Sequence, residues 1–136
     1  MPSPEQNKQT VLDFFKAWEK GRFADLEAAY RHYLAADVVY ENSGVPPCRN
    51  IEESVAFIKS ACSIPQLDIQ TIRVELRHIA ATGNIVFTER ADWHYNTAGV
   101  PTLVPVLCGI MEFNEAGKIQ RWADYFDPGP MLAAIG

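Results

Sequence analysis

The chain has 136 residues, of which 48% are hydrophobic and 21% are charged, and these proportions are typical of one folded domain over residues 1–136. The net charge of −5 argues against nucleic-acid binding, which requires a basic face. No apolar run approaches the roughly 20 residues that span a bilayer, and the first residues contain no apolar signal-peptide segment. We therefore expect a cytoplasmic protein with no membrane partner.

The cysteines and histidines give no sign of a metal site. Cys48, Cys62 and Cys108 are far apart, are odd in number and form no CxxC pair, which favours reduced thiols. The histidines also lack the spacing of metal ligands, and His94 is interpreted as a structural or pocket-rim residue. We expect no bound metal.

The first half of the chain has the apolar spacing of helices. One helix is predicted to begin after the capping residue Ser3 and to end before Gly21. A second is predicted over residues 23–34, and a third over residues 51–62 with Asn50 as its cap.

The second half has the alternating pattern of strands. Strands are predicted over residues 37–42, 71–80, 85–95, 103–113 and 118–126, followed by a short tail helix over 131–135. Turn signals between the later strands favour sequential antiparallel pairing. Helices followed by a meander of strands predict an α+β fold, in which a curved mixed or antiparallel sheet wraps around the N-terminal helices and leaves a cone with an interior pocket.

The predicted strand over residues 85–95 places Thr88, Arg90 and Asp92 on one face. If this face is open to water, Arg90 and Asp92 form a surface ion pair that contributes little to stability. If it lines a pocket, the same pair is a candidate functional site.

The last predicted strand favours the pocket. Trp122, Asp124 and Phe126 share a face, and the two large apolar side chains indicate that this face is buried. A buried carboxylate requires a partner, and Arg90 is the natural one. We therefore expect Arg90 to join Asp92 to Asp124, unless a bulge turns Asp124 towards solvent.

Tyr40 and Asn42 share a face of the strand predicted over residues 37–42 and would add neutral hydrogen-bonding groups to the same space. Alternatively, they are turn or core residues beside the loop that follows. The apolar side chains expected to line the pocket are Leu26, Leu76, Leu103, Val106, Cys108, Ile110, Trp122 and Phe126.

Three short segments together resemble a known family. They are residues 40–42 followed by Pro46 and Pro47, then residues 88–92, then residues 124–127. In this order they resemble the limonene-1,2-epoxide hydrolases, which have the cone-shaped, cystatin-like α+β roll of nuclear transport factor 2, the ketosteroid isomerases and the SnoaL-like polyketide cyclases.

The resemblance implies a cofactor-independent hydrolase that acts on an ether bond, and a homodimer. It implies that Asp92, Arg90 and Asp124 form the catalytic triad, and that Tyr40 and Asn42 help to hold a water molecule. Asp124 would be the base, Asp92 the acid and Arg90 the bridge in a one-step addition of water to a small apolar epoxide, which gives a vicinal diol.

Two other functions remain open from the sequence. One is an isomerase, dehydratase or cyclase of the same fold, with an aspartate as base on a carbon acid. The other is a non-catalytic domain that binds an apolar molecule or a protein partner. Residues 93–102 depart from the limonene enzyme and border the expected pocket mouth, so the substrate also stays open.

Overall fold

The computed structural model describes residues 2–19, 21 and 23–136. Its helices are α1 (Pro4–Trp18), α2 (Phe23–Tyr33), α3 (Ile51–Cys62) and α4 (Gly129–Ile135). Its strands are β1 (Leu34–Asn42), β2 (Thr71–Thr82), β3 (Ile85–Tyr95), β4 (Pro101–Leu103), β5 (Val106–Phe113) and β6 (Ile119–Tyr125). Within the described ranges, no helix is long and apolar enough to cross a membrane.

The predicted helix caps are confirmed. Ser3 Oγ accepts a hydrogen bond from the Gln6 backbone at 3.1 Å, and the Gln6 side chain accepts one from the Ser3 backbone at 2.8 Å. Asn50 Oδ1 accepts a hydrogen bond from the Glu53 backbone at 2.8 Å. The end of the first predicted helix adjoins residue 20, which lies outside the described residues.

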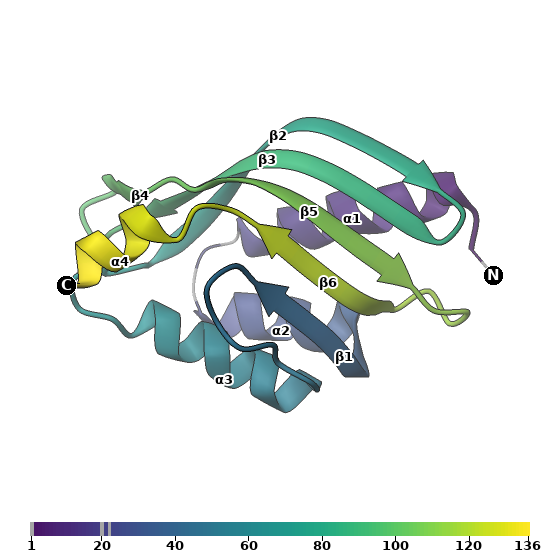
Figure 1. Cartoon of the computed structure of the whole chain (residues 1–136), viewed down its shortest axis with the longest axis horizontal. Coiled ribbons are helices and arrows are strands. Elements are labelled where there is room, and N and C mark those ends of the chain that lie inside the picture. Colours follow the sequence, from purple (N-terminus) through teal and green to yellow (C-terminus); the bar gives the residue numbers. More distant parts are fainter. Residues whose placement is uncertain (1, 20, 22) are drawn as a thin grey trace.

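The strands form one mixed sheet in the order β1-β6-β5-β3-β2, with β4 paired to β3. The pairs β2–β3, β3–β5 and β5–β6 are antiparallel, as predicted, whereas β1 runs parallel to β6. In Figure 1 the long strands arch over α1, with α2 and α3 below them, and α4 lies at one end of the sheet. The predicted α+β cone fold is confirmed.

The strand predicted over residues 103–113 is wrong at its start. Residues 104 and 105 separate β4 from β5, because Pro105 has no N–H to continue the ladder. Pro105 still accepts a hydrogen bond from the Asp92 backbone at 3.0 Å, which keeps the chain beside β3.

Aromatic rings fill the space between the helices and the sheet. Phe14 makes edge contacts with Trp18 and Trp122 at centroid distances of 5.2 and 5.3 Å, and Tyr30 makes one with Trp122 at 5.6 Å. These side chains are buried, so α1 and α2 turn aromatic residues towards the core. The same apolar environment surrounds the charged cluster described next.

Candidate active site

Arg90 joins two aspartates from different strands inside the protein. Its Nε and Nη2 donate to the two carboxylate oxygens of Asp92 at 3.0 and 3.3 Å, and Nη2 also donates to Asp124 Oδ2 at 2.7 Å. The guanidinium has no exposed surface, and both carboxylates are buried. The expected bridge between Asp92 and Asp124 is therefore present, and the surface ion pair is excluded.

Neighbouring side chains hold each member of the bridge. Thr88 Oγ1 accepts a hydrogen bond from Arg90 Nη1 at 3.1 Å, and the guanidinium lies 4.9 Å from the ring centroid of Phe15. The Trp122 indole donates to Asp124 Oδ1 at 2.9 Å. Asp124 thus accepts hydrogen bonds at both oxygens, one from an indole and one from a guanidinium.

Gly109 provides the space that the bridge occupies. It lies on β5 between Thr88 and Asp124, its register partners on β3 and β6. A Cβ atom at this position would lie 2.5 Å from Arg90 Nη1, 2.7 Å from Asp124 Oδ1 and 3.0 Å from Thr88 Oγ1. The sequence analysis missed this role; a glycine within an otherwise apolar strand was the available signal.

Tyr40 and Asn42 lie beside Asp124. The parallel pairing of β1 with β6 makes Asn42 the register partner of Asp124, and Tyr40 that of Trp122. The Tyr40 ring stacks on Trp122 at a centroid distance of 4.2 Å, and the Tyr30 hydroxyl lies 3.4 Å from that of Tyr40. Tyr30 is a polar neighbour that the sequence analysis did not include in the site.

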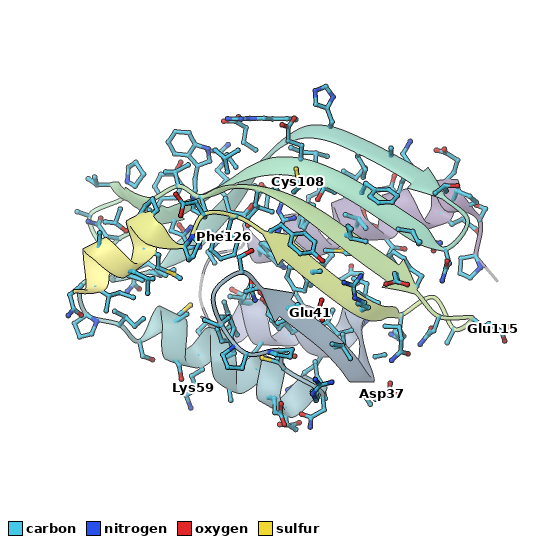
Figure 2. All side chains as sticks on the ribbon, viewed as in Figure 1. Asp37, Glu41, Lys59, Cys108, Glu115 and Phe126 are labelled. Atoms are coloured by element: carbon cyan, nitrogen blue, oxygen red, sulfur yellow. The ribbon has the colours of Figure 1, made fainter. Side chains whose placement is uncertain are left out.

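The charged cluster opens onto a cavity of about 580 Å³ with mostly apolar walls. Asp92, Asp124, Tyr40 and Asn42 all line it. The predicted wall residues that the structure also places there are Leu26, Leu103, Val106 and Phe126. Phe126 lies between the end of β6 and α4 (Figure 2).

Four predicted wall residues do not line this cavity, namely Leu76, Cys108, Ile110 and Trp122. On β5 the inward face carries Leu107 and Gly109, so Cys108 and Ile110 point the other way, because side chains alternate along a strand. The sequence alone had not determined which side chains of this strand point into the cavity.

The other two corrections have different causes. Leu76 is the register partner of Arg90, and its side chain packs on the core instead of reaching the cavity. Trp122 is fully buried beneath the Tyr40 ring and contributes to the site only through its indole N–H.

Much of the cavity wall was missed from the sequence. It comes from α3 and α4, through residues such as Ile58, Ala61, Met131, Leu132 and Ile135. The sequence predicted helices over residues 51–62 and 131–135. The two helices were therefore predicted, but the sequence alone did not show that they pack against the cavity.

Burial and charge act against each other in the cluster. Burial raises the pKa of Asp124, against the lowering effect of Arg90 and of the Trp122 hydrogen bond. Burial lowers the pKa of Arg90, but the charges of Asp124 and Asp92 outweigh it, so this pKa is raised overall. Burial and the charge of Asp124 also raise the pKa of Tyr40, which keeps this hydroxyl neutral.

The fold and the buried site together define a cone-shaped protein of the nuclear transport factor 2 type with an acid–arginine–acid cluster in its pocket. The fold is shared with an NTF2-like protein of unknown function from Burkholderia pseudomallei, at a TM-score of 0.76, 18% identity and coverage of 95% of this chain and 96% of the other. It is also shared with an isomerase-like SnoaL-family protein from Agrobacterium tumefaciens, described as putative, at a TM-score of 0.67, 15% identity and coverage of 90% and 98%.

A comparison in sequence identifies the family. Residues 5–135 match the limonene-1,2-epoxide hydrolase catalytic domain. The chain is also 28% identical to epoxide hydrolase EphG of Mycobacterium tuberculosis over 125 residues, which cover 92% of this chain and 76% of EphG. An LEH-like epoxide hydrolase structure from M. tuberculosis has the same fold, at a TM-score of 0.73, 23% identity and coverage of 98% and 92%.

The chain belongs to the limonene-1,2-epoxide hydrolase family, which confirms the resemblance seen in its sequence. Epoxide hydrolysis is the activity that this membership supports at the level of the family.

Proposed function

We propose that this protein is a cofactor-independent epoxide hydrolase that adds water to a small, largely apolar epoxide in one step and releases a vicinal diol. The observation that carries the proposal is the Arg90 bridge, which contacts Asp92 at 3.0 Å and Asp124 at 2.7 Å on the wall of an apolar cavity. Opening an epoxide with water requires a base at the water and an acid at the ring oxygen, and the bridge holds two carboxyl groups for these tasks.

Asp124 acts as the base in this proposal. It lies beside Asn42 and Tyr40, whose amide and hydroxyl groups supply further hydrogen bonds to a water molecule. Because burial raises the pKa of Asp124, its carboxylate is a stronger base than an ordinary aspartate once the pH exceeds that value. Asp124 takes one proton from the water as the oxygen attacks an epoxide carbon.

Asp92 acts as the acid and gives its proton to the epoxide oxygen as the ring bond breaks. One carboxylate, one neutral carboxyl group and one guanidinium carry no net charge together, which suits a buried site. The two acids share Arg90, whose Nη2 donates to both carboxyl groups. After turnover Asp124 holds a proton taken from the water, and Asp92 has given its own proton to the diol. Transfer of a proton from Asp124 to Asp92 restores the starting state.

The same bridge favours hydrolysis over carbon-acid chemistry. An isomerase of this fold requires one base and a donor to the developing oxyanion. A second aspartate bonded to the same guanidinium serves no step in that reaction, whereas ring opening requires an acid in addition to the base.

The proposal is tested with a panel of terpene and cycloalkene oxides in oxygen-labelled water. We expect labelled diol in a single turnover from the wild-type protein, and none from Asp124→Asn or Asp92→Asn, since an amide neither accepts the water proton nor protonates the ring oxygen. Asp13→Asn, an exposed substitution on α1, is the control. Label that first appears in an aspartate would contradict one-step attack, and failure to hydrolyse any epoxide would contradict the assignment.

We also propose that the protein acts in the cytoplasm as a homodimer. Exposed Phe87 and Tyr125 lie on the outer sheet face with Cys108 and Ile110, their register partners on β5. This apolar face supports self-association through the sheet. Light scattering after gel filtration is expected to give the dimer mass, and Phe87→Lys with Tyr125→Lys to give the monomer. A monomeric wild-type protein would contradict the proposal.

A further inference from the structure

His94 is a polar side chain on the cavity wall that the proposed mechanism does not use. It follows Asp92 by two residues on β3 and shares the inward face of that strand with Arg90 and Asp92. Its register partners are Ile72 on β2 and Leu103 on β4, which also line the cavity. The imidazole therefore lies on an otherwise apolar stretch of wall.

Two backbone carbonyls determine the tautomer of this imidazole. His94 Nδ1 lies 2.9 Å from the Asp92 oxygen and 3.2 Å from the Leu103 oxygen. Carbonyl oxygens only accept hydrogen bonds, so Nδ1 must carry a hydrogen and donate it. Burial lowers the pKa of His94, against the opposing effect of Asp92, and this keeps the ring neutral. Nε2 therefore carries a lone pair.

Nε2 has no hydrogen-bond partner within the part of the chain that the structure describes. Two other polar groups around the cavity are already engaged: Ser43 Oγ accepts from the Phe126 backbone at 3.1 Å, and the Tyr30 hydroxyl contacts that of Tyr40 at 3.4 Å. A ligand that fills the cavity would strip water from Nε2. An acceptor desolvated without a donor weakens binding, whereas a matching donor on the ligand restores it.

From this geometry we infer that His94 is a specificity-determining residue whose Nε2 accepts a hydrogen bond from a hydroxyl group on the substrate. The inference rests on the proposed function and narrows its substrate class to apolar epoxides that carry one hydroxyl substituent. His94 lies two positions from Asp92 along β3, and at about 3.3 Å per residue this places the hydroxyl roughly 7 Å from the epoxide oxygen. This is about the width of a six-membered ring with a one-carbon arm.

Two matched epoxides test the inference. One is a cyclohexene oxide with an ethyl group on a ring carbon away from the epoxide, and the other carries a hydroxymethyl group there, so that a hydroxyl replaces a methyl at nearly equal volume. Both kcat/KM and, by calorimetry with the catalytically inactive Asp124→Asn protein, Kd are measured for each. For each protein we take the ratio of the kcat/KM values, and of the Kd values, of the two epoxides. General effects on folding and catalysis cancel in these ratios.

Two variants separate recognition from structure. His94→Asn keeps a side-chain N–H near the carbonyls of Asp92 and Leu103 but has no atom at the Nε2 position. His94→Gln places an amide oxygen farther from the backbone, where it can accept a hydrogen bond. We expect the wild-type protein to prefer the hydroxymethyl epoxide about tenfold, His94→Asn to lose this preference, and His94→Gln to recover part of it.

The inference is overturned if His94→Asn keeps the wild-type ratio, or if the wild-type protein prefers the ethyl epoxide. Failure of the proposed function is recognised separately, because it appears as absent turnover of both epoxides in the wild-type protein. In that case the ratio of Kd values still decides the role of His94.

Discussion

Trp122 donates its indole N–H to Asp124, two residues further along β6, at a distance of 2.9 Å. The carboxylate is thereby held between an indole and the guanidinium of Arg90. Because the indole bonds Oδ1 and Arg90 bonds Oδ2, the plane of the carboxylate is fixed relative to the cavity. The predictions below follow from this arrangement.

Trp122→Phe is expected to raise the pKa of Asp124 further, because the indole hydrogen bond lowers it. A base with a higher pKa is protonated up to a higher pH, so the acidic limb of the kcat/KM profile should move to higher pH. The lost bond to a buried carboxylate should also cost about 1.5–3 kcal/mol in free energy of unfolding. Both are measured, the first by initial rates across pH and the second by urea unfolding.

Trp93→Phe is the matched control, since its indole donates to the exposed Glu75 at 3.2 Å. It should leave the pH profile in place and change stability by less than about 1 kcal/mol. If the two variants had the same pH profile of kcat/KM, the indole of Trp122 would not lower the pKa of Asp124 as proposed.

Gly109→Ala is expected to displace the bridge, because the new methyl group would lie within 2.5 Å of Arg90 Nη1. Overpacking of this kind costs about 1–3 kcal/mol in stability. A shift of about 1 Å in catalytic groups can reduce the rate on the order of 100-fold. Rates and unfolding midpoints are compared with those of Cys108→Ala, on the exposed face of the same strand. A fully active Gly109→Ala protein would show that the bridge does not depend on this space.

Arg90→Met is expected to lose about 3–5 kcal/mol of stability, because two buried carboxyl groups would lose their shared partner. Arg77→Met removes an exposed partner of Glu75 and should change stability by less than about 1 kcal/mol. Chemical unfolding of both variants tests the contrast. Similar losses of stability in the two variants would mean that the buried ion pairs of Arg90 contribute no more to folding than the exposed ion pair of Arg77.

The raised pKa of Asp124 also predicts a pH dependence of stability. Between the ordinary carboxyl pKa and the raised one, the folded protein binds a proton that the unfolded chain has released. The contribution of Asp124 to the free energy of unfolding is therefore full below this window and falls as the pH rises through it. Asp124→Asn lacks this titration, so the stability of the wild type minus that of the variant should fall with increasing pH.

Urea unfolding of both proteins at several pH values gives this difference directly. A difference that rises with pH would show that Arg90 lowers the pKa of Asp124 more than burial raises it. A constant difference would place the titration of Asp124 outside the range tested.

Sequence reasoning located the charged cluster because its elements follow simple rules. Alternation placed Arg90 and Asp92 on one face, and the apolar neighbours of Asp124 required a buried partner for that carboxylate. The fold class followed from the order of helices and strands.

The cavity wall was less predictable because it depends on local irregularities and on packing. Cys108 and Ile110 belong to the outward-facing set of β5, and Leu76 packs on the core beside its register partner Arg90. The parallel pairing that brings Asn42 beside Asp124 joins segments far apart in the chain, and no local pattern encodes it.

The place of α4 has a practical consequence for handling this protein. Met131, Leu132 and Ile135 contribute to the cavity, and the Ile135 carbonyl accepts a hydrogen bond from Gln66 at 3.3 Å. The two marked ends of the chain lie at opposite sides of the molecule in Figure 1. An affinity tag joined after Gly136 would therefore lie beside the cavity wall that α4 forms, whereas one joined before Pro2 would lie at the other side of the molecule.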